Sequence, residues 1–137
     1  MSVSVVVDTS VAFKWFVQAG EDSVEKAFAL LADQAAGLHT LTAPASLPVE
    51  LANALRYSKH QPYDVLDSLE NLDLSHVELF EPTSERLHAG GVLAYRHGLS
   101  IYDALFLALA EELRCPLVTA DRRAFARIDS PIEIRLL

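Results

Sequence analysis

The chain has 137 residues, of which 51% are hydrophobic and 22% charged, so it suits one domain over residues 1–137 and excludes a disordered protein. A net charge of −8 argues against a protein that coats nucleic acid through charge alone. The single cysteine, Cys115, excludes a disulfide framework and a cysteine metal site, and we expect a buried thiol. The apolar run at the start is too short to span a bilayer, so we expect a soluble, cytoplasmic protein without a membrane segment.

Hydrophobic periodicity divides the first half of the chain into strands and helices. Residues 3–7 form a β-branched run that ends at Asp8, which is typical of a strand buried on both faces of a parallel sheet. Thr9 or Ser10 can cap the helix that follows. The other elements expected here are helices over 10–17, 22–36, 47–58 and 62–72 and a strand over 39–44.

The second half continues the alternation of strands and helices. We expect a strand over 76–82, helices over 83–97 and 100–113, a strand over 116–120, a short helix over 121–127 and a strand over 132–137. This order predicts an α/β fold, a three-layer α/β/α sandwich around a mostly parallel central sheet. In such folds, ligands bind in the crevice beyond the carboxyl ends of the strands.

Four acidic residues stand where the surrounding pattern is apolar. Asp8 and Asp121 each end a strand, while Glu50 and Asp103 lie near the starts of apolar helices. Local explanations exist, because Asp8 and Asp121 can cap the next helix and Asp103 fits a capping box with Ser100. Glu50 is harder to explain locally, since a solvated helix face would carry more polar residues one turn further on.

Considered together, the four acids favour a metal site. All of them would reach the crevice at the carboxyl edge of the sheet, where clustered carboxylates repel one another unless cations are bound. Carboxylate oxygens suit Mg²⁺ or Mn²⁺, and the chemistry they favour is metal-assisted attack of water on a phosphodiester. By contrast, the acids within residues 64–73 alternate with apolar residues and indicate the solvated face of an amphipathic helix.

Four segments, in this order, resemble one family. "VVVDTSVAFKWFV", "LPVELANALR", "LSIYDALFLALA" and "LVTADRRAF" together resemble the PIN domain, in particular the VapC toxins of bacterial type II toxin–antitoxin pairs. Each segment alone is weakly specific, but all four in this order are highly specific and cover the chain from Val3 to Phe125. The resemblance implies a metal-dependent endoribonuclease that dimerises and cuts structured RNA such as tRNA or ribosomal RNA. It also implies a cognate antitoxin that inserts a segment into the active-site cleft.

The resemblance assigns roles to the four acids. Asp8, Glu50, Asp103 and Asp121 would form the catalytic site, with Mg²⁺ or Mn²⁺ as the cofactor. We expect Asp8, Asp103 and Asp121 to bind the metal, directly or through water, and Glu50 to bind it or act as general base. Some relatives carry a further acid where this chain has Arg123, so we expect one strongly bound ion.

Other residues are candidates for supporting roles. Ser10 and Thr119 would hold carboxylates or water by hydrogen bonds, and Asn53 matches a polar position one helical turn after the first helix acid. Basic residues near the same edge are candidates for RNA contact, although a solvated short helix explains the arginines equally well. These basic candidates are Lys14, Arg122, Arg123 and Arg127.

Alternatives to a toxin remain open at this point. A PIN nuclease could act in RNA maturation or on DNA, and a PIN module could serve binding or assembly without catalysis. Metal-dependent turnover separates a nuclease from a binding module, and a neighbouring antitoxin gene identifies a toxin. A phosphoacceptor receiver domain is excluded, because its fifth strand ends in a lysine and no lysine follows Lys59.

Overall fold

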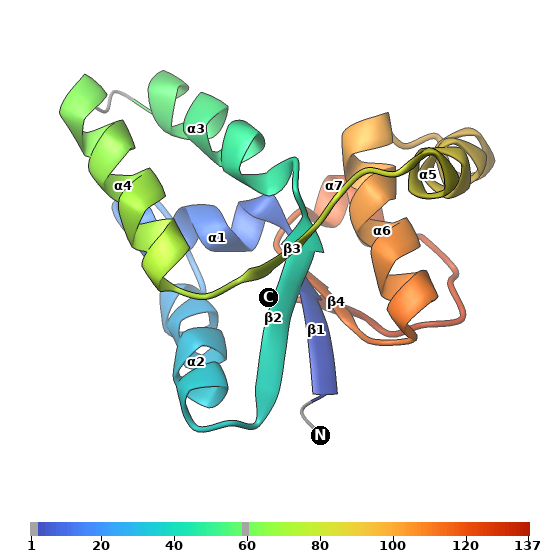
Figure 1. Ribbon diagram of the computed structural model, residues 1–137, viewed down its shortest axis with the longest axis horizontal. Helices are drawn as coiled ribbons and strands as arrows, with labels where there is room; N and C mark the ends of the chain where they lie inside the picture. The colour runs from blue at the N-terminus through green and yellow to red at the C-terminus, as the bar shows by residue number, and fades with distance from the viewer. Residues whose placement is uncertain (1–2, 59–60) are drawn as a thin grey trace.

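The computed structural model describes residues 3–58 and 61–137, which form a five-stranded parallel sheet with helices on both faces (Figure 1). The strand order is β3-β2-β1-β4-β5, and every neighbouring pair is parallel. This confirms the predicted α/β class and the parallel sheet. The strands are β1 (Val3–Val7), β2 (His39–Pro44), β3 (Glu78–Phe80), β4 (Leu117–Thr119) and β5 (Ile134–Leu136).

Each helix predicted from the sequence is present, with ends that differ by a few residues at most. Strands β3, β4 and β5 are each three residues long and are shorter than predicted. The helices are α1 (Thr9–Phe16), α2 (Val24–Ala35), α3 (Leu47–Tyr57), α4 (Pro62–Leu74), α5 (Ser84–His97), α6 (Ile101–Leu113) and α7 (Arg122–Phe125).

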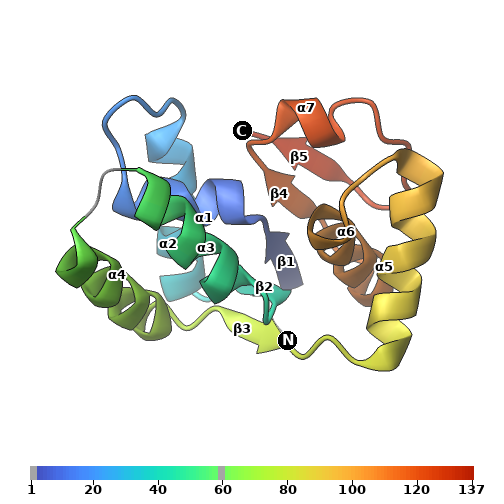
Figure 2. The same cartoon turned by 90° about the horizontal axis from the view of Figure 1, so that it is seen from above.

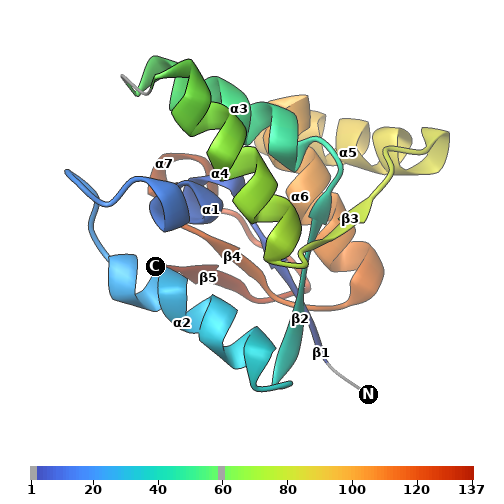
Figure 3. The same cartoon turned by 60° about the vertical axis from the view of Figure 1, so that its left-hand side comes forward.

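The helices divide into two groups, one on each side of the sheet. Helices α1 to α4 lie on one side and α5 and α6 on the other, as the view from above shows (Figure 2). With the first group turned forward, α1 to α4 stand in front of the strands (Figure 3). The contacts of α6 with β1, β2 and β4 and of α2 with β2 place the helices against the sheet, so the predicted three-layer sandwich is confirmed.

Strand β1 and helix α6 are almost uninterrupted apolar runs because both lie in the hydrophobic core. Val5–Val7 are buried because β1 is the central strand, with neighbours on both edges and helices over both faces. Ala104–Ala110 of α6 are all buried, because α6 packs between the sheet and α5. At Gly90 of α5, a Cβ atom would come within 3.0 Å of the Leu105 side chain, so a glycine permits this close approach of α5 to α6.

The sheet brings the acids to one edge. β1 and β4 are parallel neighbours, with Val7 beside Val118, so Asp8 after β1 lies near the residues that follow β4. Glu50 and Asp103 are in the first turns of α3 and α6. Within the described part of the chain, none of the helices has the length and apolar character that crossing a membrane requires.

Candidate active site

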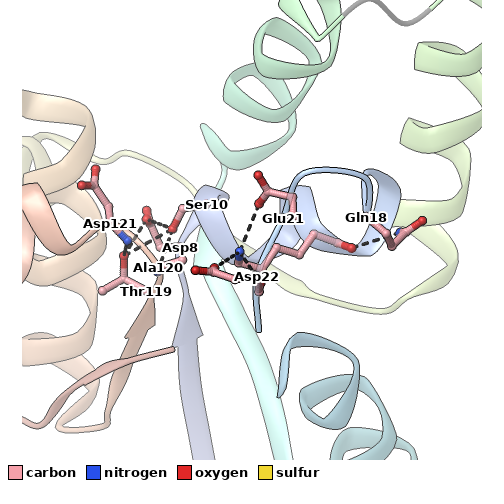
Figure 4. Close-up of polar contacts among 9 residues, drawn as sticks. Asp8, Ser10, Gln18, Glu21, Asp22, Thr119, Ala120 and Asp121 are labelled. Atoms are coloured by element: carbon pink, nitrogen blue, oxygen red, sulfur yellow. Dashed lines mark hydrogen bonds and ion pairs between the residues drawn. The ribbon is translucent and has the colours of Figure 1, made fainter. Parts of the chain in front are cut away.

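Asp8 is the most buried of the four acids, with 4% of its surface exposed. It occupies the N-cap position of α1 but makes no side-chain capping bond, so the local capping explanation is wrong for this residue. Instead, its Oδ2 atom accepts hydrogen bonds from Ser10 Oγ at 2.6 Å and Thr119 Oγ1 at 2.9 Å (Figure 4). Burial raises the pKa of Asp8, these hydroxyls partly oppose the rise, and the charge of Asp121 adds to it.

The two hydroxyls connect Asp8 to the end of β4. Ser10 Oγ accepts a hydrogen bond from the Ala120 amide, and Thr119 Oγ1 accepts one from the Asp121 amide, each at 3.0 Å. Because each hydroxyl oxygen accepts from a backbone amide, its own proton is directed to the Asp8 carboxylate. The network therefore fixes one oxygen of Asp8 and ties the ends of β1 and β4 together (Figure 4). Ser10 and Thr119 thus lie beside the acids, at the positions that we predicted from the sequence.

Asp121 does cap a helix. Its Oδ1 atom accepts a hydrogen bond from the Ala124 amide at 3.0 Å, at the start of α7. The local explanation is therefore correct for Asp121, but capping occupies one carboxylate oxygen and does not remove the residue from the cluster. Its charge contributes to the raised pKa values of both Asp8 and Asp103.

Glu50 and Asp103 come from the two helices that border the cleft. Glu50 Oε2 accepts a hydrogen bond from Ser46 Oγ at 3.0 Å, and burial, followed by the charges of Asp8 and Asp103, raises its pKa to about 7. The α6 helix is capped by Ser100, whose Oγ accepts from the Asp103 amide at 3.1 Å. Burial, then Asp8 and Asp121, raises the pKa of Asp103, while the Ser100 hydroxyl opposes the rise.

An open cleft runs between α3 and α6, and Glu50 and Asp103 both line it. Asn53, which is exposed one turn after Glu50, lines it as well, so the structure places this residue at the site expected from the sequence. Asp8 lies buried beside the cleft, and its charge acts on both Glu50 and Asp103. The structure thus brings all four predicted acids into one electrostatic cluster.

The donor set fits a hard divalent cation by its chemistry. Neighbouring carboxylates help to raise the pKa values of Asp8, Glu50 and Asp103, and no lysine or arginine contributes to these shifts. As placed, however, no three His, Cys, Asp or Glu side chains of the described residues converge closely enough to surround one ion. Glu50 and Asp103 therefore share the cleft, and Asp8 and Asp121 act on this pair through their charges, but these described residues form no preassembled ligand shell.

Lys14 is placed differently from the sequence prediction. It is 3% exposed, and its ammonium donates hydrogen bonds to Glu21 Oε1 at 3.0 Å and to the Asp22 carbonyl oxygen at 2.7 Å. A further contact at 3.3 Å joins it to Asp22 Oδ1. These bonds hold the segment before α2 against α1 (Figure 4). Because the ammonium is buried and paired with two acids, we correct its assignment from RNA contact to local structure.

The three arginines near α7 do not share one environment. Arg122 donates a hydrogen bond to the Leu137 carbonyl oxygen at 3.0 Å, so its guanidinium is partly engaged with the end of β5. Arg123 and Arg127 are exposed, and neither forms a hydrogen bond or ion pair recorded for residues 3–58 and 61–137. These two side chains are open to a phosphate.

Two features of the site were not anticipated. Ser46, which bonds Glu50, lies four residues before it, a spacing at which helical side chains meet, so this pair could have been found from the sequence. The pairing of Lys14 with Glu21 and Asp22 depends on how the chain turns between α1 and α2. The hydrophobic pattern of the sequence does not predict that turn.

This chain is similar to one protein family and to several known proteins. The sequence matches the family described as PIN domain over residues 5–131. Ribonuclease VapC1 from two strains of Mycobacterium tuberculosis is 36% identical over 102 residues, which are 69% of this chain and 73% of the relative. Among solved structures, Mycobacterium tuberculosis VapC20, described as a sarcin–ricin loop cleaving toxin, is similar with a TM-score of 0.71 and 15% identity, over 94% of this chain and 98% of that one.

A second solved structure supports the same fold. VapBC2 from Rickettsia felis, crystallised with a DNA fragment from the promoter of the pair, has a TM-score of 0.64 and 22% identity. The match covers 96% of each chain.

Proposed function

Because the chain belongs to the PIN domain family, we propose that its acidic cleft hydrolyses RNA phosphodiester bonds with Mg²⁺ or Mn²⁺, as the toxin of a toxin–antitoxin pair. One observation carries this proposal: Glu50 and Asp103 line one cleft, and the nearby charges of Asp8 and Asp121 help to raise the pKa values of acids in this cluster. The 36% identity of this chain to Ribonuclease VapC1 supports RNA as the substrate.

We assign the cation to Asp8, Asp103 and Asp121, which would hold it directly or through water. A bound divalent ion supplies Lewis-acid stabilisation of phosphoryl oxygens and lowers the pKa of a coordinated water. The Ser10 and Thr119 hydroxyls keep Asp8 Oδ2 fixed, so the other oxygen of that carboxylate remains for a ligand.

Glu50 is the proposed general base. Burial raises its pKa to about 7 in the metal-free protein, and we propose that this carboxylate accepts a proton from the attacking water and releases it afterwards. Water then attacks phosphorus, the bond to the 3′ oxygen breaks, and the products carry 5′-phosphate and 3′-hydroxyl ends. Arg123 and Arg127, which are exposed, would bind flanking phosphates.

We further propose that the protein acts in the cytoplasm, on tRNA or ribosomal RNA, as a homodimer whose cleft is blocked by a cognate antitoxin. The likeness to VapBC structures supports an antitoxin partner. The exposed apolar side chains on α3 and α5, which include Val49, Tyr57 and Val92, support association with further protein.

Cleavage of total RNA by purified protein tests the nuclease proposal. We expect discrete fragments in Mg²⁺ or Mn²⁺ and none in chelator, and we expect Asp8→Asn protein to be inactive. Asp67→Asn is the matched control, because Asp67 is an exposed aspartate on α4. Equal cleavage by wild type and Asp8→Asn would reveal a contaminating nuclease and contradict the proposal.

A further inference from the structure

The cleft that holds Glu50 and Asp103 also carries two exposed apolar side chains. Val49 on α3 is 73% exposed and Tyr102 on α6 is 60% exposed, and both line the cleft. Each directly precedes one of the acids, so on each helix the apolar and acidic side chains leave the axis roughly 100° apart. The cleft therefore presents apolar surface directly beside the carboxylates from two helices.

The exposure of Tyr102 contrasts with the rest of its helix. The next turns of α6 are buried from Ala104 to Ala110, yet the ring of Tyr102 remains in contact with water. Single exposed apolar residues are common on protein surfaces and need no special explanation. Tyr95 on α5 is such a residue, because it is 95% exposed and is not among those that line the cleft. What distinguishes Tyr102 is its position at the acids.

We propose that Tyr102 stacks on an RNA base beside the scissile phosphate and thereby determines which nucleotides enter the cleft. This inference rests on the nuclease function proposed above. Within one nucleotide, the ribose links base and phosphate, so a phosphate held at the acids brings its base within reach of the residues next to them. Base–aromatic stacking accepts any base but requires that it be unpaired, so the cleft selects single-stranded or splayed-out nucleotides.

Two neighbours of Tyr102 would complete the base site. Val49 offers apolar contact from α3, and Asn53, one turn further along the same helix, is exposed. The Asn53 amide can donate to and accept from the edge of a base. Stacking on the ring and bonding at the edge are complementary, because the first fixes the plane of the base and the second reads its identity.

Kinetics on an RNA fragment identified in the total-RNA digest test this inference. Stacking is present in the ground state and the transition state alike, so Tyr102→Ala should raise KM about tenfold and leave kcat almost unchanged. Tyr102→Phe keeps the ring and should behave as wild type, whereas Tyr102→Leu keeps apolar bulk without the ring and should resemble the alanine variant. Tyr95→Ala is the matched control for loss of an exposed tyrosine.

Several outcomes would overturn the stacking role. They are an unchanged KM for Tyr102→Ala, full activity of Tyr102→Leu, or an equal loss in Tyr95→Ala. If RNA turnover is unchanged and only inhibition by the antitoxin weakens, Tyr102 contacts protein instead and the inference is wrong.

A binding measurement separates this inference from the nuclease proposal. Short single-stranded RNA that contains 2-aminopurine is mixed with the protein in chelator, and quenching of the base fluorescence reports stacking. Wild type and Tyr102→Phe should quench it, and Tyr102→Ala should not. Quenching without any metal-dependent cleavage by wild type would contradict only the nuclease proposal, whereas cleavage without Tyr102-dependent quenching would contradict only the stacking role.

Discussion

The hydroxyl of Thr119 lies 2.9 Å from Asp8 Oδ2, although 111 positions separate the two residues in the chain. This bond joins the carboxyl ends of two neighbouring parallel strands and buries an acid in a defined orientation. Thr119 is fully buried, so the bond is shielded from competing water. The same hydroxyl accepts the Asp121 amide, and one side chain therefore organises two of the four acids.

Replacing Thr119 by valine should reduce stability and activity together. Thr119→Val keeps the shape but removes the hydrogen bond to buried Asp8 and leaves the Asp121 amide without its acceptor, at a cost of about 1–3 kcal/mol in the free energy of unfolding. Denaturant unfolding measures the loss. Thr119→Ser restores the hydroxyl and should recover most RNA cleavage, and a valine variant as stable as wild type would contradict this role for the bond.

The stability of the metal-free protein should fall as pH rises. Glu50 has a pKa of about 7 in the folded protein against 4.5 ordinarily, so the folded state holds this proton more tightly than the unfolded state does. Its favourable contribution is present below about pH 4.5 and is lost progressively up to about pH 7. In chelator, Glu50→Gln should flatten the dependence of unfolding free energy on pH in this window. An unchanged slope would show that burial does not perturb Glu50.

Ser100 should stabilise the protein as the N-cap residue of α6. Ser100 Oγ accepts the Asp103 amide, so Ser100→Ala should lower the free energy of unfolding by about 1 kcal/mol. Ser100→Asp restores a capping oxygen but adds a further negative charge near the cluster, so it should rescue the helix poorly without metal and well with it. Thermal unfolding with and without Mg²⁺ checks both expectations; rescue independent of Mg²⁺ would argue against the charge effect.

RNA binding should depend on the exposed arginines and not on Lys14. In chelator, replacing Arg123 or Arg127 by glutamine removes one phosphate contact, so the slope of log affinity against log salt should decrease by roughly 0.7 for single-stranded RNA. Lys14→Met should leave the slope unchanged, because its ammonium is already paired with Glu21 and Asp22. A lower slope for Lys14→Met would restore it as an RNA contact.

Much of the fold follows from the sequence, for reasons that particular residues make clear. The run Val5–Val7 and the apolar helix Ala104–Ala110 are buried on several sides, so their hydrophobicity predicts them without ambiguity. The four acids could be predicted as site residues because they interrupt or end such apolar runs. The ends of the short strands Glu78–Phe80, Leu117–Thr119 and Ile134–Leu136 were harder to predict, since they depend on where pairing with neighbouring strands stops.

The environment of Lys14 could not be predicted from the sequence. Its position one turn after Ser10 correctly suggested the same side of α1, and both residues line one hollow beside the acids. Its partners, however, lie in the turn before α2, where Gly20 and Ser23 adopt left-handed backbone conformations. Such a turn reverses the chain and returns Glu21 and Asp22 to α1, and nothing periodic in the sequence encodes that return.

Binding of Mn²⁺, followed by electron paramagnetic resonance of the free ion, tests the central claim most directly: that Asp8, Asp103 and Asp121, which come from separate elements, form one cation site. We predict one strong site in wild type, a large loss of affinity in Asp8→Asn, Asp103→Asn and Asp121→Asn, and wild-type affinity in the exposed control Asp67→Asn. Equal affinity in wild type and all three site variants would contradict the claim, because the acids would then be near one another without acting together.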